Sequence, residues 1–243
     1  MIMRNSPYKF LPALNRDKRG GTVQNVQDII RDAIVRLELP PGVFIDKKAL
    51  CEQLGISRFP VSEALGRLAD EGFVEVLPQH GTRVTRIDLT DCAEAMFIRR
   101  ALESECLRRI APRIDGTLID ALNRNMLDQQ AAMARDDRVR FHACDIALHD
   151  LLLEALAYER VKTAVFAARA KLDRLRLFMC TPHRQASTFA EHRRIVDALV
   201  AGDAAAAGHA MEQHLDMVMA ELTEFAAANP DIFETAEKAT AAA

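Results

Sequence analysis

Four side chains in the C-terminal two thirds of the chain have the types and spacing needed to hold a metal ion. Asp145 and His149 lie four residues apart, so both point from one face of a predicted helix. His192 and His214 lie on two later predicted helices. A carboxylate and three imidazoles that converge inside a helical bundle would form a site for a divalent metal ion.

Ordinary explanations of the same residues are more frequent when spacing alone is considered. Single histidines on helices are mostly exposed or hydrogen-bonded within a core. Asp145 and His149 could also form a simple ion pair along one helix. Two further histidines, His142 and His209, are alternative ligands. A third, His183, lies beside a proline and is expected in a loop.

Residues that could contact DNA surround a turn at Gly55. The apolar spacing in KKALCEQLGISRFPVSEALGRL predicts two crossing helices, with the glycine between them in the left-handed conformation. In a helix-turn-helix, the second helix enters the major groove, where an Arg side chain can bind guanine. The residues predicted to face DNA are Ser57, Arg58, Phe59 and Ser62 on that helix, Lys48 on the helix before it, and His80 and Gly81 beyond it.

These DNA-facing residues require helices followed by a β-hairpin. Thr22 is the predicted N-cap of the first helix. Two segments of alternating apolar residues around Pro78 predict the hairpin, with the His-Gly pair at its tip. The order is that of a winged helix-turn-helix, although a helical hairpin can also result from packing alone. The predicted helices cover 23–37, 47–54 and 57–70, and the predicted strands cover 73–77 and 82–87.

The four candidate metal ligands require a second, purely helical region. From Leu89 onward the apolar period is helical, with breaks at prolines and at short polar turns. The sequence therefore predicts a mainly α protein, with an N-terminal winged helix-turn-helix and a C-terminal all-α six-helix bundle. The six helices are expected at 89–112, 115–135, 138–157, 159–180, 185–201 and 203–228.

The organisation predicted from these elements has four parts. Residues 1–21 are polar and basic and are expected to form a flexible arm, and residues 22–88 form the winged helix-turn-helix. Residues 89–228 form the helical domain for metal, effector and dimer contacts, and residues 229–243 form an Ala-rich tail.

Composition limits the class of protein. The chain has 243 residues, of which 49% are hydrophobic and 28% charged, so it can bury a sizeable core. The net charge of -3 is unevenly distributed along the chain. Residues 1–88 carry 13 Lys/Arg and 11 Asp/Glu, whereas residues 89–243 carry 19 Lys/Arg and 24 Asp/Glu. No apolar run reaches the ~18 residues of a membrane helix, and no signal peptide is apparent. Five cysteines without a CxxC motif predict reduced thiols and a cytoplasmic location.

The segment from residue 45 to 87 resembles the winged helix of GntR-family bacterial regulators. It shares the Gly turn, Ser-Arg-x-Pro-Val, Glu-Ala-Leu, Arg-Leu, Glu-Gly and a closing Gly in the wing. The resemblance implies that Arg58 reads DNA, and that Lys48, His80 and Gly81 contact it. Ser62 is a departure, because many members have Arg at this position.

The helical region resembles the FCD ligand-binding domain of the FadR subfamily of these regulators. Members with the full pattern bind a divalent metal, often zinc, with a small carboxylate beside it. The resemblance thus implies that the four metal-binding candidates are the ligands, and Leu148 is a departure because Phe is common there. The matching parts are Arg99 to Glu103, Asp145 to His149, Glu191-His192 with Ile195 and Ala198, and His214-Leu215.

Two arginines are candidates for binding the carboxylate of an effector. The guanidinium groups of Arg99 and Arg176 could each bind a carboxylate through two parallel hydrogen bonds. The alternative for both residues is an ordinary exposed or ion-paired arginine.

Together these patterns predict a metabolite-responsive bacterial transcription regulator, with repression the commoner mode in such families. We expect a homodimer that binds a palindromic operator in double-stranded DNA, a divalent metal, most simply Zn²⁺, and a small carboxylate effector. No membrane contact is expected. Two alternatives are an enzyme in which the metal activates water, and a regulator whose metal is purely structural.

Overall fold

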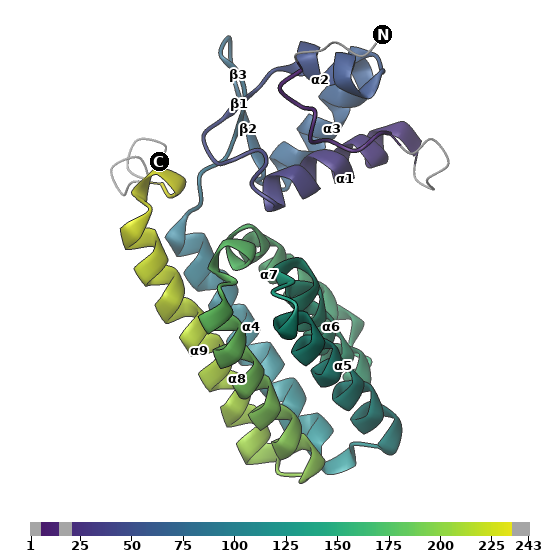
Figure 1. The fold of residues 1–243 in the computed structure, drawn as a ribbon, viewed down its shortest axis with the longest axis vertical. Coiled ribbons are helices and arrows are strands. Elements are labelled where there is room, and N and C mark those ends of the chain that lie inside the picture. The colour runs from purple at the N-terminus through teal and green to yellow at the C-terminus, as the bar shows by residue number, and fades with distance from the viewer. Residues whose placement is uncertain (1–5, 15–20, 235–243) are drawn as a thin grey trace. The chain divides into compact units, whose positions relative to one another are not determined.

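The computed structural model describes residues 6–14 and 21–234, except for the side chains at positions 171, 173, 174 and 176–178. The chain divides into two compact units. The head unit contains the chain up to Asp88 together with the segment from Pro230 onward, and the helical unit spans Leu89–Asn229. The prediction of a mainly α protein is confirmed (Figure 1).

The head unit is a winged helix-turn-helix. Its helices are α1 (Gly21–Val35), α2 (Lys47–Leu54) and α3 (Arg58–Asp70), and its strands are β1 (Phe44–Ile45), β2 (Val74–Leu77) and β3 (Gly81–Val84). The sheet is antiparallel with the order β1-β3-β2. The sequence predicted the β2–β3 hairpin but not β1, because two residues are too short to display an alternating pattern.

Local chemistry sets the positions of α2 and α3. The Asp46 carboxylate caps α2 by accepting from the backbone N–H groups of Lys48 and Ala49. Gly55 ends the helix with a φ of 64°, the left-handed conformation predicted for the turn. Thr22 is not the N-cap of α1, because that helix already begins at Gly21. The apolar faces of all three helices meet in one core that includes Ile30, Ile34, Leu50, Val61, Leu65 and Leu68.

The prediction of a flexible N-terminal arm does not hold for residues 6–14. Tyr8 and Leu11 are buried in the core of the head. The Tyr8 hydroxyl also accepts a hydrogen bond of 2.7 Å from the backbone N–H of Asp46, the residue that caps α2. Two apolar residues in a polar stretch show no helical or strand period, so the sequence gave no sign of this packing. Residues 15–20 lie outside the described part of the chain.

The first residues of the predicted C-terminal tail are packed against the head unit. Pro230–Ile232 form a short 3₁₀ turn, and Phe233 is buried in the head unit. Ile87 pairs with Phe233 through two backbone hydrogen bonds: its N–H donates to Ile232, and its carbonyl accepts from Glu234. Residues 230–234 are therefore part of the head rather than a separate tail, while residues 235–243 lie outside the described range.

The helical unit contains the six helices that were predicted. They are α4 (Leu89–Ile110), α5 (Gly116–Ala134), α6 (Arg138–Leu156), α7 (Glu159–Met179), α8 (Pro182–Val200) and α9 (Ala204–Ala228). In the part of the chain that the structure describes, no helix has the length and apolar character needed to cross a membrane.

The start of α8 differs from the prediction. Pro182 begins this helix instead of interrupting the chain, and His183 is therefore helical rather than in a loop. The hydroxyl of Thr181 caps the helix by accepting from the backbone N–H of Arg184. Proline fits the first turn because its missing N–H would have no helical partner there.

Helices α4 and α9 lie side by side (Figure 1). They approach closely at Gly208, which is buried in α9. A Cβ at this position would lie 2.6–2.8 Å from the Nε, Cγ and Cζ atoms of Arg108 on α4. Arg108 in turn binds Glu212 at 2.6 Å. The absence of a side chain at position 208 thus lets the arginine cross the surface of α9.

We predict that Gly208→Ala destabilises the helical unit by about 1–3 kcal/mol, because the whole Arg108 side chain must move. Urea unfolding monitored by helical circular dichroism measures the change. Gly116→Ala is the matched control, since a Cβ there would contact nothing within 4 Å. Equal destabilisation by both substitutions would contradict this account of the contact.

Candidate metal centre and nucleic-acid interface

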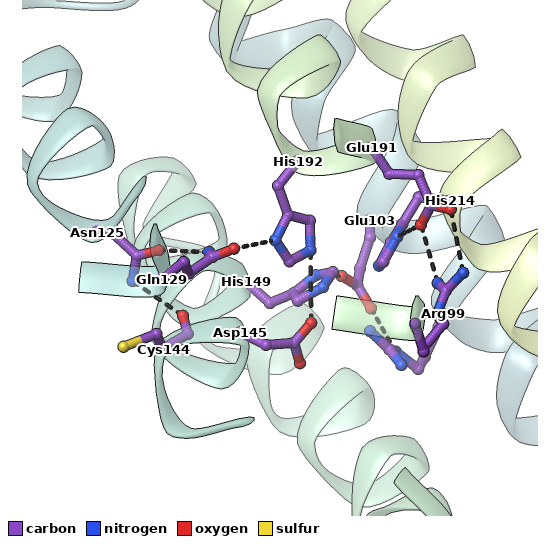
Figure 2. Close-up of polar contacts among 11 residues, drawn as sticks. Arg99, Glu103, Asn125, Gln129, Cys144, Asp145, His149, Glu191, His192 and His214 are labelled. Atoms are coloured by element: carbon purple, nitrogen blue, oxygen red, sulfur yellow. Dashed lines mark hydrogen bonds and ion pairs between the residues drawn. The ribbon is translucent and has the colours of Figure 1, made fainter. Parts of the chain in front are cut away.

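The structure brings the four predicted metal ligands together in the interior of the helical unit. Asp145, His149, His192 and His214 are all buried, and one potential ligand atom from each lies within 4.8 Å of the others. Figure 2 shows the three imidazoles and the carboxylate directed toward a common centre. The same-face spacing on α6 places the first two residues side by side, as predicted.

Three different helices supply this cluster. Asp145 and His149 come from α6, His192 from α8 and His214 from α9. The ring centroids of the imidazoles are 4.8–5.7 Å apart. Apolar neighbours on the same helices, Leu148, Ile195 and Leu215, are fully buried and fix each helix in the bundle. Rigid helices therefore hold the polar groups in place.

Each imidazole is oriented by a contact to its Nδ1 atom. His149 donates to Glu103 at 2.5 Å and His214 to Glu191 at 2.7 Å. Carboxylates accept hydrogen bonds, so the proton in each pair lies on Nδ1. The opposite nitrogen, Nε2, is then the lone-pair donor that a metal requires, and the Nε2 of His149 makes no hydrogen bond to a described residue.

His192 is oriented by a chain of amides instead of a carboxylate. The Cys144 carbonyl can only accept, so the Nδ2 group of Asn125 donates a hydrogen bond to it at 2.9 Å. The Asn125 side-chain oxygen in turn accepts a hydrogen bond from Nε2 of Gln129 at 2.7 Å. The Gln129 side-chain oxygen therefore accepts a hydrogen bond from Nδ1 of His192 at 2.9 Å. This sequence of contacts assigns the same tautomer to His192 as to the other two histidines (Figure 2).

Two buried guanidinium groups balance the carboxylates behind the histidines. Arg99 donates to Glu103 at 2.7 Å, and Arg184 forms two hydrogen bonds to Glu191 at 2.9 and 3.1 Å. Burial by itself would raise the pKa of the Glu103 carboxyl, but Arg99 and His149 hold that pKa well below its usual range. Glu103 is therefore present as an acceptor for the imidazole proton of His149.

The structure places Arg99 in a buried ion pair. Its side chain is fully buried and pairs with Glu103, so it is not exposed at the surface, and its role in effector binding stays a prediction. Arg176 lies on α7, but its side chain is outside the described part of the structure.

The cluster fits a divalent metal in both chemistry and charge. Three imidazole nitrogens and one carboxylate form a donor set that suits zinc and related divalent ions. Arg99 pairs with Glu103, and Arg184 pairs with both Glu191 and Glu221. Because Asp145 adds a further negative charge, a bound dication would balance the excess negative charge of these groups. Asp145 lies 3.4 Å from His192 Nε2 rather than forming a simple pair with His149, which binds Glu103.

The other candidate histidines lie outside this cluster. His209 is 67% exposed and lies 3.8 Å from Glu212. His183 is exposed in the first turn of α8. His142 is partly exposed and lines a cavity beside Asp145. That cavity has a volume of about 40 Å³ and is also lined by Phe141, Arg184, Gln185, Thr188 and Val218.

Several residues that build the centre were not identified from the sequence. Gln129 and Asn125 carry no motif, although their four-residue spacing places both on one face of α5. Arg184 precedes Glu191 by seven residues, or two helical turns, which was the available signal for that pair. Glu103 and Glu191 were noted only as parts of the family pattern, without their contacts to histidines.

The predicted DNA-facing residues are exposed at the start of α3 and on α2. Ser57 occupies the N-cap position of α3, and Arg58, Phe59 and Ser62 follow within its first two turns. Lys48 is exposed in the first turn of α2. The side chains are available to a nucleic acid, and their roles remain predictions.

The wing has the conformation expected of a tight hairpin tip. His80 is exposed in the turn between β2 and β3, and Gly81 opens β3 with a φ of 104° that favours glycine. Gln79 also has a positive φ, of 64°. Behind the tip, Arg83 pairs with Glu75 at 2.6 Å across the strands and lies over the Phe44 ring.

Comparison with family models assigns both units. The model described as "Bacterial regulatory proteins, gntR family" matches residues 22–84, and the FCD domain model matches residues 94–217. The FCD match covers the four clustered ligands and the residues that hold them.

Individual relatives agree with this assignment. A Streptomyces ambofaciens HTH-type transcriptional regulator is 34% identical over 85% of this chain and 87% of its own. The Escherichia coli K12 transcriptional repressor RspR is 29% identical over 86% of this chain and 92% of its own. A solved GntR transcriptional regulator from Rhodococcus sp. RHA1 has the same fold, with a TM-score of 0.71 and 24% identity over 83% of this chain and 97% of that one.

We predict that His192→Ala and His214→Ala each abolish stoichiometric metal binding, because each removes an imidazole from the cluster. Elemental analysis of protein incubated with zinc and then desalted measures the result. His142→Ala and His209→Ala are the matched controls and should retain the metal. Full occupancy in His214→Ala, or loss in His142→Ala, would show that the ligands were chosen wrongly.

A second prediction concerns the carboxylate behind His149. Glu103→Gln should weaken metal affinity about 10- to 100-fold, because the neutral amide no longer favours the required Nδ1 proton. Competition with a chromogenic chelator measures affinity, while circular dichroism confirms folding. Glu105→Gln is the control on the same helix, since Glu105 is exposed and pairs with Arg109. Unchanged affinity in a folded Glu103→Gln protein would exclude this role for Glu103.

Proposed function

The chain belongs to the GntR family of bacterial regulatory proteins, within its FadR subfamily, and on that premise we propose that it is a metabolite-responsive repressor. The family and these relatives are transcriptional regulators rather than enzymes. In this proposal the head unit binds operator DNA, while the helical unit binds a divalent metal and a small carboxylate effector. The observation that carries it is the buried cluster of three histidines and one aspartate.

The exposed chemistry of the head supports DNA binding. Arg58 stands at the N-terminal end of α3, where a helix in the major groove presents its side chains to base edges. Its guanidinium would bind a guanine through O6 and N7. Lys48 would neutralise a phosphate, and the open backbone at Gly81 would allow the wing to approach the sugar-phosphate chain.

The protonation of the cluster supports metal binding. All three Nδ1 atoms are engaged by acceptors, so Asp145, His149, His192 and His214 would bind the metal through Nε2 atoms and a carboxylate oxygen. Zinc is the metal that we propose, because it favours imidazole and carboxylate ligands. The bound ion would supply positive charge and a coordination position for an effector oxygen.

Coordination and space support an effector that binds through an oxygen atom. A carboxylate oxygen would occupy an open coordination position on the bound dication. The small cavity beside Asp145 provides adjacent space, and Arg99 lies buried near the cluster through its contact with Glu103. We propose that Arg99 contributes to effector binding through its positive charge. The role predicted for Arg176 remains a proposal as well.

Assembly and mode of action complete the proposal. A single helix-turn-helix makes few base contacts, so we propose a homodimer on a palindromic operator in the cytoplasm. Repression is proposed because the relative from Escherichia coli is named a repressor. Effector binding would change operator affinity through a coupling between the two units.

We predict that Arg58→Ala weakens binding to the selected operator by about 1–3 kcal/mol per half-site, because a guanine contact is lost. Lys48→Ala should instead weaken all sequences equally and reduce the salt dependence. Fluorescence anisotropy at several salt concentrations distinguishes the two effects. Arg109→Ala, an exposed arginine of the helical unit, is the control. If Arg58→Ala binds the operator with wild-type affinity, the proposed position of α3 in the major groove is wrong.

The proposed effector site predicts stabilisation by carboxylates. A panel of small mono- and dicarboxylates should include a compound that raises the melting temperature of zinc-loaded protein with increasing concentration, since it binds only the folded state. The same compound should not stabilise His214→Ala and should change operator affinity in wild type. Stabilisation without any change in operator affinity would instead support a purely structural metal and a passive ligand.

A further inference from the structure

Phe59 is the most exposed large apolar side chain of the α3 surface, with 74% of its area accessible. We propose that its ring packs against the C5-methyl group of a thymine and thereby selects T·A at one position of the operator. This inference rests on the proposed placement of α3 in the major groove. It adds an apolar determinant of sequence to the polar contact of Arg58.

The position of Phe59 on α3 points it away from the protein. The residues of α3 that face the core are Val61, Ala64, Leu65 and Leu68, all of them buried. At about 100° per residue, Phe59 lies on the opposite side of the helix from this face. In the free protein the ring is therefore exposed to water and lies outside the core of the head unit.

The glycine at position 66 is a second, independent feature of the same surface. Gly66 is exposed in the middle of α3 and lies two helical turns beyond Phe59, on nearly the same line. A Cβ there would meet no atom of the described residues within 4 Å, so no contact among them explains its absence. Glycine within a helix is also less favourable than alanine. A bare backbone at this point would let α3 approach a groove closely.

The chemistry of the groove identifies the partner of the ring. Phenylalanine has no hydrogen-bonding atom, so it cannot read the polar edges of the bases. The thymine methyl is the apolar group that B-DNA presents in its major groove, and apolar side chains recognise it. Arg58 is adjacent in sequence and provides hydrogen-bond donors for a guanine. The pair Arg58-Phe59 would therefore recognise a guanine and a thymine at neighbouring positions.

The test uses full-length protein and a duplex selected by the wild type from a random-sequence library. Each thymine of that duplex is replaced in turn by deoxyuridine, which removes only the methyl group. We expect replacement of one thymine to weaken wild-type binding about fourfold, the effect of burying one methyl group. The same replacement should have no effect on Phe59→Ala, while Leu127→Ala, an exposed apolar residue of α5, should behave like wild type.

Gly66→Ala provides a test of the close approach. Because alanine favours the helix and meets no neighbour, this variant should melt a few degrees higher than wild type yet bind the selected duplex more weakly. A merely structural glycine would not separate stability from DNA binding in this way. Unchanged or tighter DNA binding by Gly66→Ala would overturn the close approach.

The remaining outcomes decide the proposal. If no deoxyuridine replacement weakens wild-type binding, or if Phe59→Ala responds as strongly as wild type, Phe59 does not read a thymine methyl. If the wild type selects no sequence from the library, the proposed operator binding itself fails, and the inference fails with it. These results are distinguishable because the selection precedes the base replacement.

Discussion

Burial of ionisable side chains is the constraint on which the helical unit depends. A carboxylate or guanidinium taken out of water must find an opposite charge and hydrogen-bond partners, or the unit loses stability. Here Arg99 and Arg184 each meet a glutamate, and each glutamate accepts the proton of a histidine. The helices must therefore pack so that several polar contacts are satisfied together, which leaves little freedom in their mutual positions.

The helices at the two ends of the unit both contribute residues to these contacts. Arg99 and Glu103 are on α4, the first helix, and His214 is on α9, the last. The chain enters this unit through α4 and leaves it through α9, and just outside it Ile87 pairs with Phe233 in the head unit. Glu103, which orients His149, and His214, a member of the cluster, thus lie on the first and last helices of the unit.

Local patterns predicted the elements well and their non-local contacts poorly. The six-helix region, the Gly55 turn and the β2–β3 hairpin followed from periods and turn residues that act over a few positions. Tyr8, the strand β1 and Phe233 were missed. Each of them is stabilised by a partner far away in the sequence, and none belongs to a segment long enough to show a period.

For the candidate site, the sequence by itself determined the ligand types and the shared face of Asp145 and His149, since helical spacing fixes side-chain direction. The sequence could not determine which of the histidines are buried or which residues form hydrogen bonds with them. Whether His142 or His149 faces the interior depends on how α6 packs against α4, α5 and α7. Only the tertiary structure decided that Glu103, Glu191 and Gln129 hold the three Nδ1 protons, because hydrogen bonds between helices depend on distances that no local pattern encodes.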